Sequence, residues 1–455
     1  MHGFERKNGL NNCKRVICIV LATVCLFSSQ AWGRPPELPP EARDDLYRRL
    51  KVLAEALDIV QKNYVETVSA EDLVHGAVSG IVDQLDPHSS FLPPDMFHEM
   101  QVETEGVFGG LGIEVTAREG RLVVVSPIED TPASRAGIQA GDVIVMIEGD
   151  PVKDLPLSEA VKRMRGPKGT QVTIHVARKG WDAPQPFTLT REVIHIRSVR
   201  HRVVDGVGVV RIAQFQKETH LEVRRAIEEV MANGSPRGLV LDLRNNPGGL
   251  LDQAVKVADV FLTQGTVVST RGRDPEQELV FTARDDGDEP FVPLVVLINE
   301  GTASASEIVA GALQDHGKAL VLGQRSFGKG SVQTIIPLSD GSGLRVTTAL
   351  YYTPAGRSIQ AKGIVPDIEV LPGAKSQKMD SDLGAPHHSQ VREEDLERHF
   401  ETPDQVGEGD AAAAETIATD DQPLSRAVEI LKSWQIFSNL KAPQTPPDEE
   451  FRDDP

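Results

Sequence analysis

Cysteine is scarce in this 455-residue chain, and none follows residue 25. All three cysteines (Cys13, Cys18 and Cys25) lie in one N-terminal stretch, so we expect a processed chain without disulfides, a thiol nucleophile or a cysteine metal site. Basic residues are also few relative to acidic ones, since the formal net charge is −19. An acidic chain lacks the basic surface of a nucleic-acid-binding protein, and we expect neither nucleic acid nor anionic lipid as a partner.

Long apolar runs are missing as well, and the run near the N-terminus, Val16–Phe27, is only twelve residues long. Four basic side chains precede it, at Arg6, Lys7, Lys14 and Arg15. Small residues follow it and offer cleavage after Ala31 or Gly33. This order predicts a signal peptide over residues 1–33 and export to the periplasm, because the run is too short for a comfortable membrane span. The alternative is an uncleaved segment that anchors the protein to the membrane.

The rest of the chain changes character at four points. Residues 34–102 show apolar residues at helical spacing and predict an N-terminal helical region. Residues 103–190 begin with a glycine-rich stretch and alternate short β-type runs with two short helices, whereas residues 191–372 repeat strand, turn and helix. Residues 373–420 are acidic and poor in apolar side chains, which predicts a flexible linker before a C-terminal helix and tail over residues 421–455.

Residues Gly323–Lys329 (GQRSFGK) nearly spell a phosphate-binding loop. Such a loop needs Ser or Thr directly after the lysine and must open a helix. Here Gly330 follows, and the alternating residues Ser331–Pro337 predict a strand instead. The lysine therefore has another task, and we expect no nucleotide cofactor.

Two strand–turn–helix units carry small residues at their turns. Gly238–Arg244 is followed by Asn-Asn-Pro-Gly-Gly, and Leu294–Asn299 is followed by Gly-Thr-Ala-Ser-Ala-Ser. Adjacent strands would bring both turns to one edge of the sheet, where a glycine amide and the amide after a serine form an oxyanion hole. Ser304 and Ser306 are both candidates for a nucleophile, although serine at this position is often only a helix cap.

A serine nucleophile requires a base, and two residues are candidates. His316 follows Asp315 and suggests a Ser/His/Asp triad, but a histidine at a helix end is commonly a solvated cap. Lys329 acts as a base only if burial or a nearby cation lowers its pKa from about 10.4 toward neutrality. Gln333 lies at an even offset from Lys329, so we expect it on the same strand face, where its amide oxygen could orient the amine.

These motifs resemble those of the carboxyl-terminal processing proteases, serine endopeptidases with a Ser-Lys dyad. The resemblance rests on GTASASEI, on FGKGSVQ with 25 residues from Ser304 to Lys329, and on LDPHSSFL, GLGIEV, RGPKGT, LDLRNNPGGLL and GIVPD. It implies an α/β multidomain fold, with a Clp/crotonase-like protease core, an inserted PDZ domain and the N-terminal helical region. It further implies Ser304 as nucleophile, Lys329 as general base, Gln333 as its orienter, and an oxyanion hole formed by Gly248 or Gly249 together with Ala305.

Residues 103–190 resemble a PDZ domain, which adds a peptide as an extra strand and holds its C-terminal carboxylate in loop amides. The peptide-binding residues so implied are Gly109, Gly110, Leu111, Gly112, Ile113 and Val115. Arg165 is a candidate for coupling between PDZ movement and the active site, and the equal alternative is a solvated arginine at a helix end. His88 in LDPHSS is expected to be a turn residue.

The sequence thus predicts an exported, ATP-independent serine endopeptidase that cleaves proteins near apolar C-termini, without cofactor or metal. Its expected partners are protein substrates, an adaptor protein and a second copy of the chain. A homodimer would use the N-terminal helices and Leu424–Trp434, by analogy with the family. The rival from another class is a non-catalytic PDZ scaffold that binds protein C-termini.

Overall fold

The computed structural model describes residues 40–371, 392–400 and 421–440, except residues 119, 129, 233, 235, 275–277 and 288. The predicted signal peptide, most of the predicted linker and the tail after residue 440 lie outside the described residues. The helices are α2 (Pro40–Asn63), α3 (Ala70–Val82), α4 (Pro94–Glu105), α5 (Pro132–Arg135), α6 (Leu157–Met164), α7 (Thr219–Ala232), α8 (Leu251–Asp259), α9 (Ala305–Asp315) and α11 (Gln422–Leu440), with the 3-10 turn η2 (Glu393–Asp395).

The chain divides inside α3 into two compact units, residues 1–77 and 78–455. The described part of the first unit is helical, as the apolar spacing predicts. Leu46, Leu50 and Leu53, which form the predicted apolar stripe of α2, are exposed in this single chain.

The part of the second unit predicted as the protease core is built around a six-stranded sheet in the order β10-β11-β12-β15-β16-β19. Its strands are β10 (Val199–Val204), β11 (Val207–Ile212), β12 (Leu239–Asp242), β15 (Leu294–Ile298), β16 (Ala319–Gly323) and β19 (Ile368–Glu369). β10 is antiparallel to β11, and the other neighbours are parallel. The β12–β15 pairing confirms that the two small-residue turns leave the sheet at the same edge.

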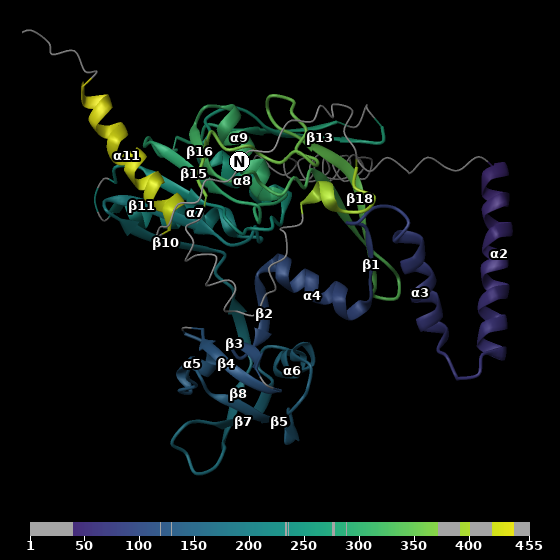
Figure 1. The fold of residues 1–455 in the computed structure, drawn as a ribbon. Helices are drawn as coiled ribbons and strands as arrows, with labels where there is room; N and C mark the ends of the chain where they lie inside the picture. The colour runs from purple at the N-terminus through teal and green to yellow at the C-terminus, as the bar shows by residue number, and fades with distance from the viewer. Residues whose placement is uncertain are drawn as a thin grey trace, which may run out of the picture. The chain divides into compact units, whose positions relative to one another are not determined.

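Both faces of this sheet are covered. Alternate strand residues such as Leu239 and Leu241 face α7, α8 and α9, whereas Val240 and its neighbours face the opposite side. That opposite side is covered by α11 through Leu424, Ala427, Val428 and Leu431 (Figure 1). The expectation that Leu424–Trp434 forms a dimer surface is therefore wrong for these apolar residues, because they are buried against the protein's own sheet.

A second sheet joins segments far apart in the sequence, in the order β1-β18-β13-β14 with β17 also paired to β18. These strands are β1 (Ser90–Leu92), β13 (Gly265–Gly272), β14 (Leu279–Ala283), β17 (Ser331–Pro337) and β18 (Gly343–Tyr352). β1 lies in the LDPHSSFL motif, so part of this predicted turn is a strand. The pairing of β1 with β18 brings the motif to the sheet that carries Gln333.

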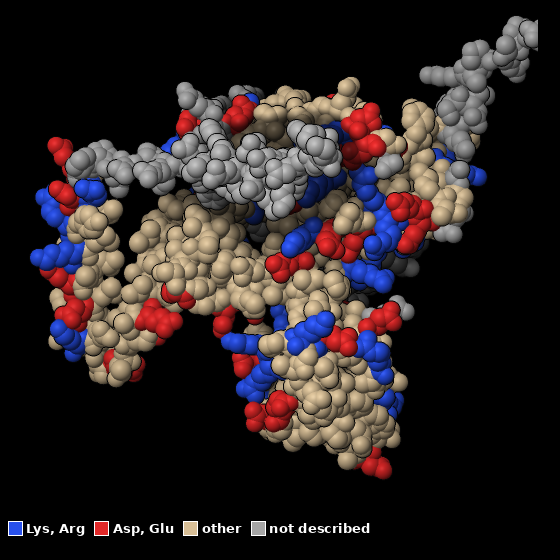
Figure 2. Space-filling view, turned by 180° about the vertical axis from the view of Figure 1, so that it is seen from behind, with Lys and Arg blue, Asp and Glu red and all other residues tan. Residues whose placement is uncertain are grey.

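Residues 107–195 form a separate β-rich module with its own core. Its strands are β2 (Val107–Gly110), β3 (Ile113–Arg118), β4 (Arg121–Pro127), β5 (Val143–Ile147), β6 (Asp150–Pro151), β7 (Gln171–Ala177), β8 (Gln185–Thr190) and β9 (Glu192–His195). The main sheet has the order β3-β4-β5-β7-β8, and the predicted helices appear as α5 and α6. β2 and β9 pair where the chain enters and leaves the module. On the face shown in Figure 2, acidic and basic side chains lie next to one another.

Candidate active site

Ser304 lies at the turn between β15 and α9, directly before the first helical residue. Its backbone has φ 56° and ψ −116°, a conformation that L-residues rarely adopt and that costs roughly 1–3 kcal/mol. The residue is only 8% exposed. Strained residues persist where surrounding contacts hold them, and such positions concentrate at functional sites. The serine is thus fixed at the edge where the sheet and the helix meet.

The Pro-Gly-Gly turn after β12 packs directly against this serine. Gly248 has φ 104°, and a Cβ added to it would lie 2.8 Å from Cβ of Ser304 and 3.0 Å from the nitrogen of Ala305. Gly249 has φ 138°, and its Cβ would lie 2.2 Å from the carbonyl oxygen of Phe215. Only glycine fits at both positions.

The predicted oxyanion-hole residues are Gly248, Gly249 and Ala305, and the question is whether their N–H groups already have hydrogen-bond acceptors. The N–H of Gly248 donates to Oδ1 of Asn246 at 2.9 Å, so this donor is occupied in the resting arrangement. Ala305 is the first residue of α9, and the first N–H groups of a helix have no partner within it. Gly249 immediately follows Gly248 in the turn. The structure thus brings the turn and Ala305 together beside Ser304.

A buried carboxylate that the sequence analysis missed links the serine to the lysine. Glu307 is fully buried, and its Oε2 accepts the N–H of Ser304 at 2.8 Å and that of Lys329 at 2.9 Å. Its Oε1 accepts the hydroxyl of Ser326 at 2.5 Å and the N–H of Gly328 at 2.8 Å. Burial raises the pKa of Glu307 to about 7, and these four donors oppose a larger rise. The Ser-x-x-Glu spacing is that of a capping box, which was the available signal.

Lys329 lies in the loop between β16 and β17 and is half-buried. Burial lowers the pKa of its amine below the usual 10.5, and the positive charge of Arg345 lowers it further. The carboxylates of Glu393, Glu307 and Asp86 act in the opposite direction without cancelling these effects. This is the environment that a lysine base requires.

The predicted geometry of Gln333 is wrong in one respect. Lys329 precedes β17 instead of lying on it, and the pairing of β17 with β18 shifts register between Val332 and Gln333. An even sequence offset therefore does not place both side chains on one strand face. Nε2 of Gln333 donates to Oγ of Ser331 at 2.9 Å, which is a bond within β17. None of the described hydrogen bonds joins the Gln333 amide to the amine of Lys329.

The LDPHSS motif contributes more than a turn. Asp86 accepts hydrogen bonds from the backbone of His88 and from both the backbone and the hydroxyl of Ser89. It also accepts the hydroxyl of Thr347 at 3.0 Å, and Thr347 lies opposite Gln333 on β18. Burial opposes ionisation of Asp86, but these donors outweigh it and its pKa lies below the usual value. His88 lies in a turn, as expected, and its Nε2 also contacts Glu393 at 2.7 Å.

Tyr351 connects the two halves of the site. Its hydroxyl faces the side chain of Ser304, and its backbone N–H donates to the carbonyl of Gly330 at 2.7 Å. Burial raises the pKa of the phenol to about 12, so it remains protonated at neutral pH. No local sequence pattern indicated this residue, because the contact joins β18 to the start of α9.

The alternative nucleophile and base have other partners. Ser306 is fully buried, and its hydroxyl donates to the carbonyl of Asn246 at 3.0 Å. His316 caps the far end of α9, about 18 Å along the helix from Ser304, and its Nε2 contacts the carbonyl oxygen of Thr266 at 2.7 Å. This geometry disfavours a triad through His316.

The β-rich module carries an apolar groove beside β3, an edge strand of its sheet. The groove is lined by Phe108, Gly110, Leu111, Gly112, Ile113, Val115, Val161, Met164 and Arg165. Of the predicted peptide-binding glycines, Gly109 and Gly110 belong to β2, whereas Gly112 lies with Leu111 between β2 and β3. Arg165 is half-buried and stacks 4.6 Å from the ring centre of Phe108, so it is not a freely solvated helix-end arginine.

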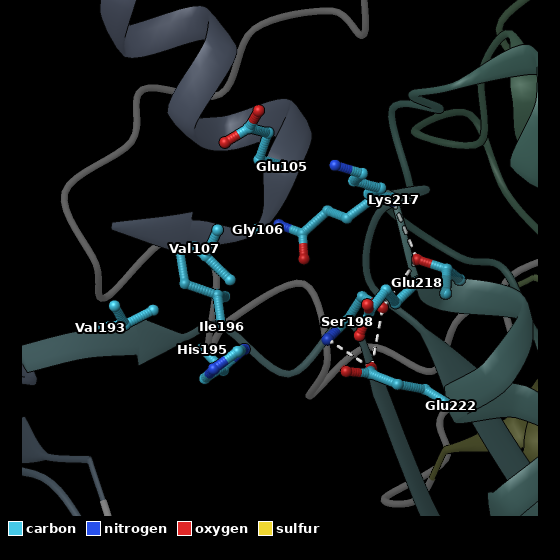
Figure 3. A pocket seen from close by; sticks show the side chains of 12 residues that line it. Glu105, Gly106, Val107, Val193, His195, Ile196, Ser198, Lys217, Glu218 and Glu222 are labelled. Atoms are coloured by element: carbon cyan, nitrogen blue, oxygen red, sulfur yellow. Dashed lines mark hydrogen bonds between the residues drawn. The ribbon is translucent and has the colours of Figure 1, made fainter. Parts of the chain in front are cut away.

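A second cavity, of about 280 Å³, lies where the chain enters and leaves this module. Figure 3 shows Glu105, Gly106, Val107 and His195 on one side and Ser198 with Glu222 on the other. Glu222 accepts the N–H and the hydroxyl of Ser198, both at 2.9 Å, which fastens the returning chain to α7. Within the described residues there is no His, Cys, Asp or Glu cluster suited to a metal ion, and no helix long and apolar enough to cross a membrane.

A buried serine at a strained strand-to-helix turn, tied to a half-buried lysine and accompanied by a peptide-groove module, defines a serine-type peptidase. Comparison with known families agrees: peptidase family S41 matches residues 206–370, a PDZ domain matches residues 109–183, and the N-terminal domain of the activating protease CtpB matches residues 36–95. The carboxy-terminal-processing protease of Bartonella bacilliformis is 44% identical over 396 residues, spanning 85% of this chain and 89% of that protein. The chain belongs to the carboxyl-terminal-processing proteases of peptidase family S41.

Two further relatives have similar descriptions. The carboxyl-terminal-processing protease of Synechocystis sp. is 39% identical over 318 residues, which span 68% of this chain and 74% of that protein. A solved structure described as the photosystem II D1 C-terminal processing protease is 33% identical, with a TM-score of 0.42, and covers 70% of this chain and 92% of that one. The matches to the family models and to the two named relatives confirm the resemblance inferred from the motifs, and the structure agrees with the mixed α/β fold that has a protease domain, a PDZ domain and an N-terminal helical region.

Proposed function

We propose that this peptidase cleaves exported proteins near their C-termini with Ser304 as nucleophile and Lys329 as general base. Nζ of neutral Lys329 takes the proton from Oγ of Ser304 while that oxygen bonds to the scissile carbonyl carbon. The tetrahedral oxyanion is stabilised by the N–H of Ala305 and a donor from the Pro-Gly-Gly turn. The lysine then returns the proton to the leaving amine, and water hydrolyses the acyl-enzyme.

The shared carboxylate of Glu307 is the observation that carries this proposal. By holding the backbone nitrogens of Ser304 and Lys329 on one oxygen, it keeps the two loops at a fixed separation. The depressed pKa of Lys329 supports a neutral amine at a lower pH than a free lysine allows. No ATP is needed, since the chemistry uses only this chain and water.

The hydrogen bonds of Gln333 and Gly248 bear on the proposed step. Gln333 donates through Nε2 to Ser331, and its amide oxygen is the atom that would accept a hydrogen bond from the amine of Lys329. If Gly248 supplies the oxyanion donor, its N–H must leave Asn246, whereas Gly249 requires no such release from that side chain. Arg165, which stacks on Phe108 in the peptide groove, is positioned to respond to a bound peptide.

The substrate is proposed to be a protein with an apolar C-terminus. The unpaired edge of β3 can accept an extended peptide, and the lining by Leu111, Ile113 and Met164 favours apolar side chains. Export to the periplasm, assembly as a homodimer and delivery of substrate by an adaptor are parts of the proposal carried over from the sequence and the family.

The test is hydrolysis of an unfolded reporter with an apolar C-terminal residue, measured at a single protein concentration. Ser304→Ala and Lys329→Ala are each expected to abolish turnover, whereas His316→Ala should retain it. Loss with His316→Ala and activity in Lys329→Ala would instead establish a Ser/His/Asp triad. Binding of the reporter without hydrolysis by the wild-type protein would support a PDZ scaffold.

A further inference from the structure

Residues 392–400 lie inside the segment predicted as a linker and beyond the match to the peptidase family at residues 206–370. The structure places them against the catalytic core. Arg392 pairs with Glu300 at 3.4 Å, Glu394 pairs with Arg325, and Nη1 of Arg398 donates to the carbonyl of Asp83 at 2.6 Å. We call residues 392–400 the strap, and predicting it as linker was wrong, because it is fastened to three separate segments.

Glu393 is the buried centre of the strap, with no exposed surface. Its Oε2 lies 2.7 Å from Nε2 of His88, and its Oε1 accepts Nε2 of Gln360 at 2.7 Å. Its backbone N–H donates to the carbonyl of Phe327 at 3.3 Å, two residues before Lys329. A buried carboxylate is costly unless it is paired, so both side-chain partners are needed to hold it.

The contacts of Glu393 continue to the backbone beside the proposed base. Oε1 of Gln360 accepts the N–H of Gly330 at 2.9 Å. The chain at Gly330 packs so closely on Gln360 that an added Cβ would lie 2.4 Å from the Gln360 nitrogen. Lys329 is therefore held on one side by Glu307 and on the other by Gln360, whose amide group is fixed by Glu393.

From these contacts we infer that the strap completes the catalytic site and that Glu393 is a positioning residue, which fixes the Lys329 loop through Gln360 and the LDPHSS loop through His88. This inference rests on the proposed role of Lys329. It assigns a task in the reaction to a segment outside the peptidase family match.

Glu393 also influences the charge of Lys329. The charged groups that act on the amine are Arg345 from β18, Glu307 from α9, Asp86 from the LDPHSS loop and Glu393 from the strap. The carboxylate of Glu393 stabilises the ammonium form and raises the pKa of Lys329 relative to a neutral residue there. Removing this charge should lower that pKa, a change that loss of packing alone would not produce.

The test compares Glu393→Gln with Glu394→Gln in the full chain, by measuring kcat/KM for the reporter across pH. Glu394→Gln is the matched control, because it removes one negative charge from the same strap at an exposed side chain, whose pair with Arg325 contributes little while the other contacts still hold the strap. For Glu393→Gln we expect a maximum of kcat/KM roughly tenfold to a hundredfold lower, together with an acidic limb shifted to lower pH. For Glu394→Gln we expect neither change.

A second readout does not require turnover. In the Ser304→Ala background, trace labelling of lysines by acetic anhydride at several pH values reports the titration of Lys329 after peptide mass analysis. Glu393→Gln should move the Lys329 midpoint to lower pH, and Glu394→Gln should not. A lower rate with an unmoved limb and midpoint, or equal shifts in both variants, would overturn the inference.

These outcomes separate the strap from the proposed function. Absence of Lys329-dependent hydrolysis in the wild-type protein, with the labelling shift still present, would refute the proposed function and leave the strap contact in place. If hydrolysis depends on Lys329 but Glu393→Gln leaves it unchanged, the positioning role of Glu393 is refuted and the proposed function is retained.

Discussion

The backbone nitrogens of Ser304 and Lys329 donate to the same carboxylate oxygen, Oε2 of Glu307, at 2.8 and 2.9 Å. The two residues are far apart in sequence, and one buried side chain fixes the relation between their loops. A site built in this way is sensitive to changes at a residue that touches no substrate.

Replacing Glu307 by Gln should lower kcat/KM about a hundredfold or more. Gln substitutes a donor for one acceptor oxygen, so N–H groups that now donate to the carboxylate would face another donor. Unpaired buried donors should also lower the free energy of unfolding by about 1–3 kcal/mol. Glu307→Asp keeps the charge but reaches fewer donors, and its activity should fall between that of the wild type and that of Glu307→Gln. Wild-type kinetics in Glu307→Gln would contradict the linking role.

The free energy of unfolding should depend on pH through the carboxyl group of Glu307. Its pKa is about 7 in the folded chain against 4.5 for a glutamate in water, so the folded state binds the extra proton between these limits. The stabilisation from this group is complete below pH 4.5 and is lost as the pH rises to about 7. Denaturant unfolding of the wild type and Glu307→Gln at several pH values measures the difference, which should decline across this window. A constant difference would exclude the raised pKa.

The acidic limb of the kcat/KM profile should lie below pH 10.5, the ordinary pKa of a lysine in water, because burial and Arg345 lower the pKa of Lys329. Activity should rise with pH through this lowered pKa, since only the neutral amine accepts a proton. Lys329→Arg should lose about 10²–10⁴-fold in rate, because the guanidinium stays protonated. Lys318→Arg, at a lysine that contacts the carbonyl of Pro290, is the matched control and should retain activity.

Replacing Gly248 by Ala should abolish activity and destabilise the fold. Its φ of 104° disfavours any side chain, and the new methyl group would meet Ser304 and Ala303 at under 3 Å. Gly356 provides the comparison, because its φ is 75° but nothing lies within 4 Å of an added Cβ. Gly356→Ala should cost only about 1–2 kcal/mol of backbone strain and preserve kcat/KM. Equal effects in the two variants would show that strain, and not contact with the serine, determines the loss.

The helix α11 should depend on an ion pair at its start. Arg244 makes paired hydrogen bonds to Asp421 at 2.7 and 3.0 Å and also binds Asp242, and these partners hold the pKa of Arg244 above its usual value despite burial. Asp421→Ala should lower the free energy of unfolding by about 1–3 kcal/mol, since Arg244 stays buried with part of its pairing lost. Lys432, which is also on α11, makes a more exposed pair with Asp205, and Lys432→Ala should cost less than Asp421→Ala. Similar losses in both would contradict a special role for Arg244.

Local patterns in the sequence determined much of this protein. Alternation and helical spacing predicted β4, β5, β7, α5, α6 and the two strand–turn–helix units, because each element buries one face at a fixed period. The small residues Ser304 and Gly248 could also be predicted as turn positions from the sequence, because close packing at a turn leaves room only for small side chains. The family also followed from short motifs.

Only the tertiary structure decided which distant residues meet. Because the strand pairing shifts register before Gln333, an even offset from Lys329 does not place the two side chains on one strand face. The contact of His88 with Glu393 joins residues 305 positions apart. The apolar face of α11 looked available for a partner until the structure placed it on the sheet. Hydrogen bonds between such segments, and the side chains buried where they pack, depend on how the chain folds back on itself. A periodic pattern within one segment does not indicate which distant segment will pack against it.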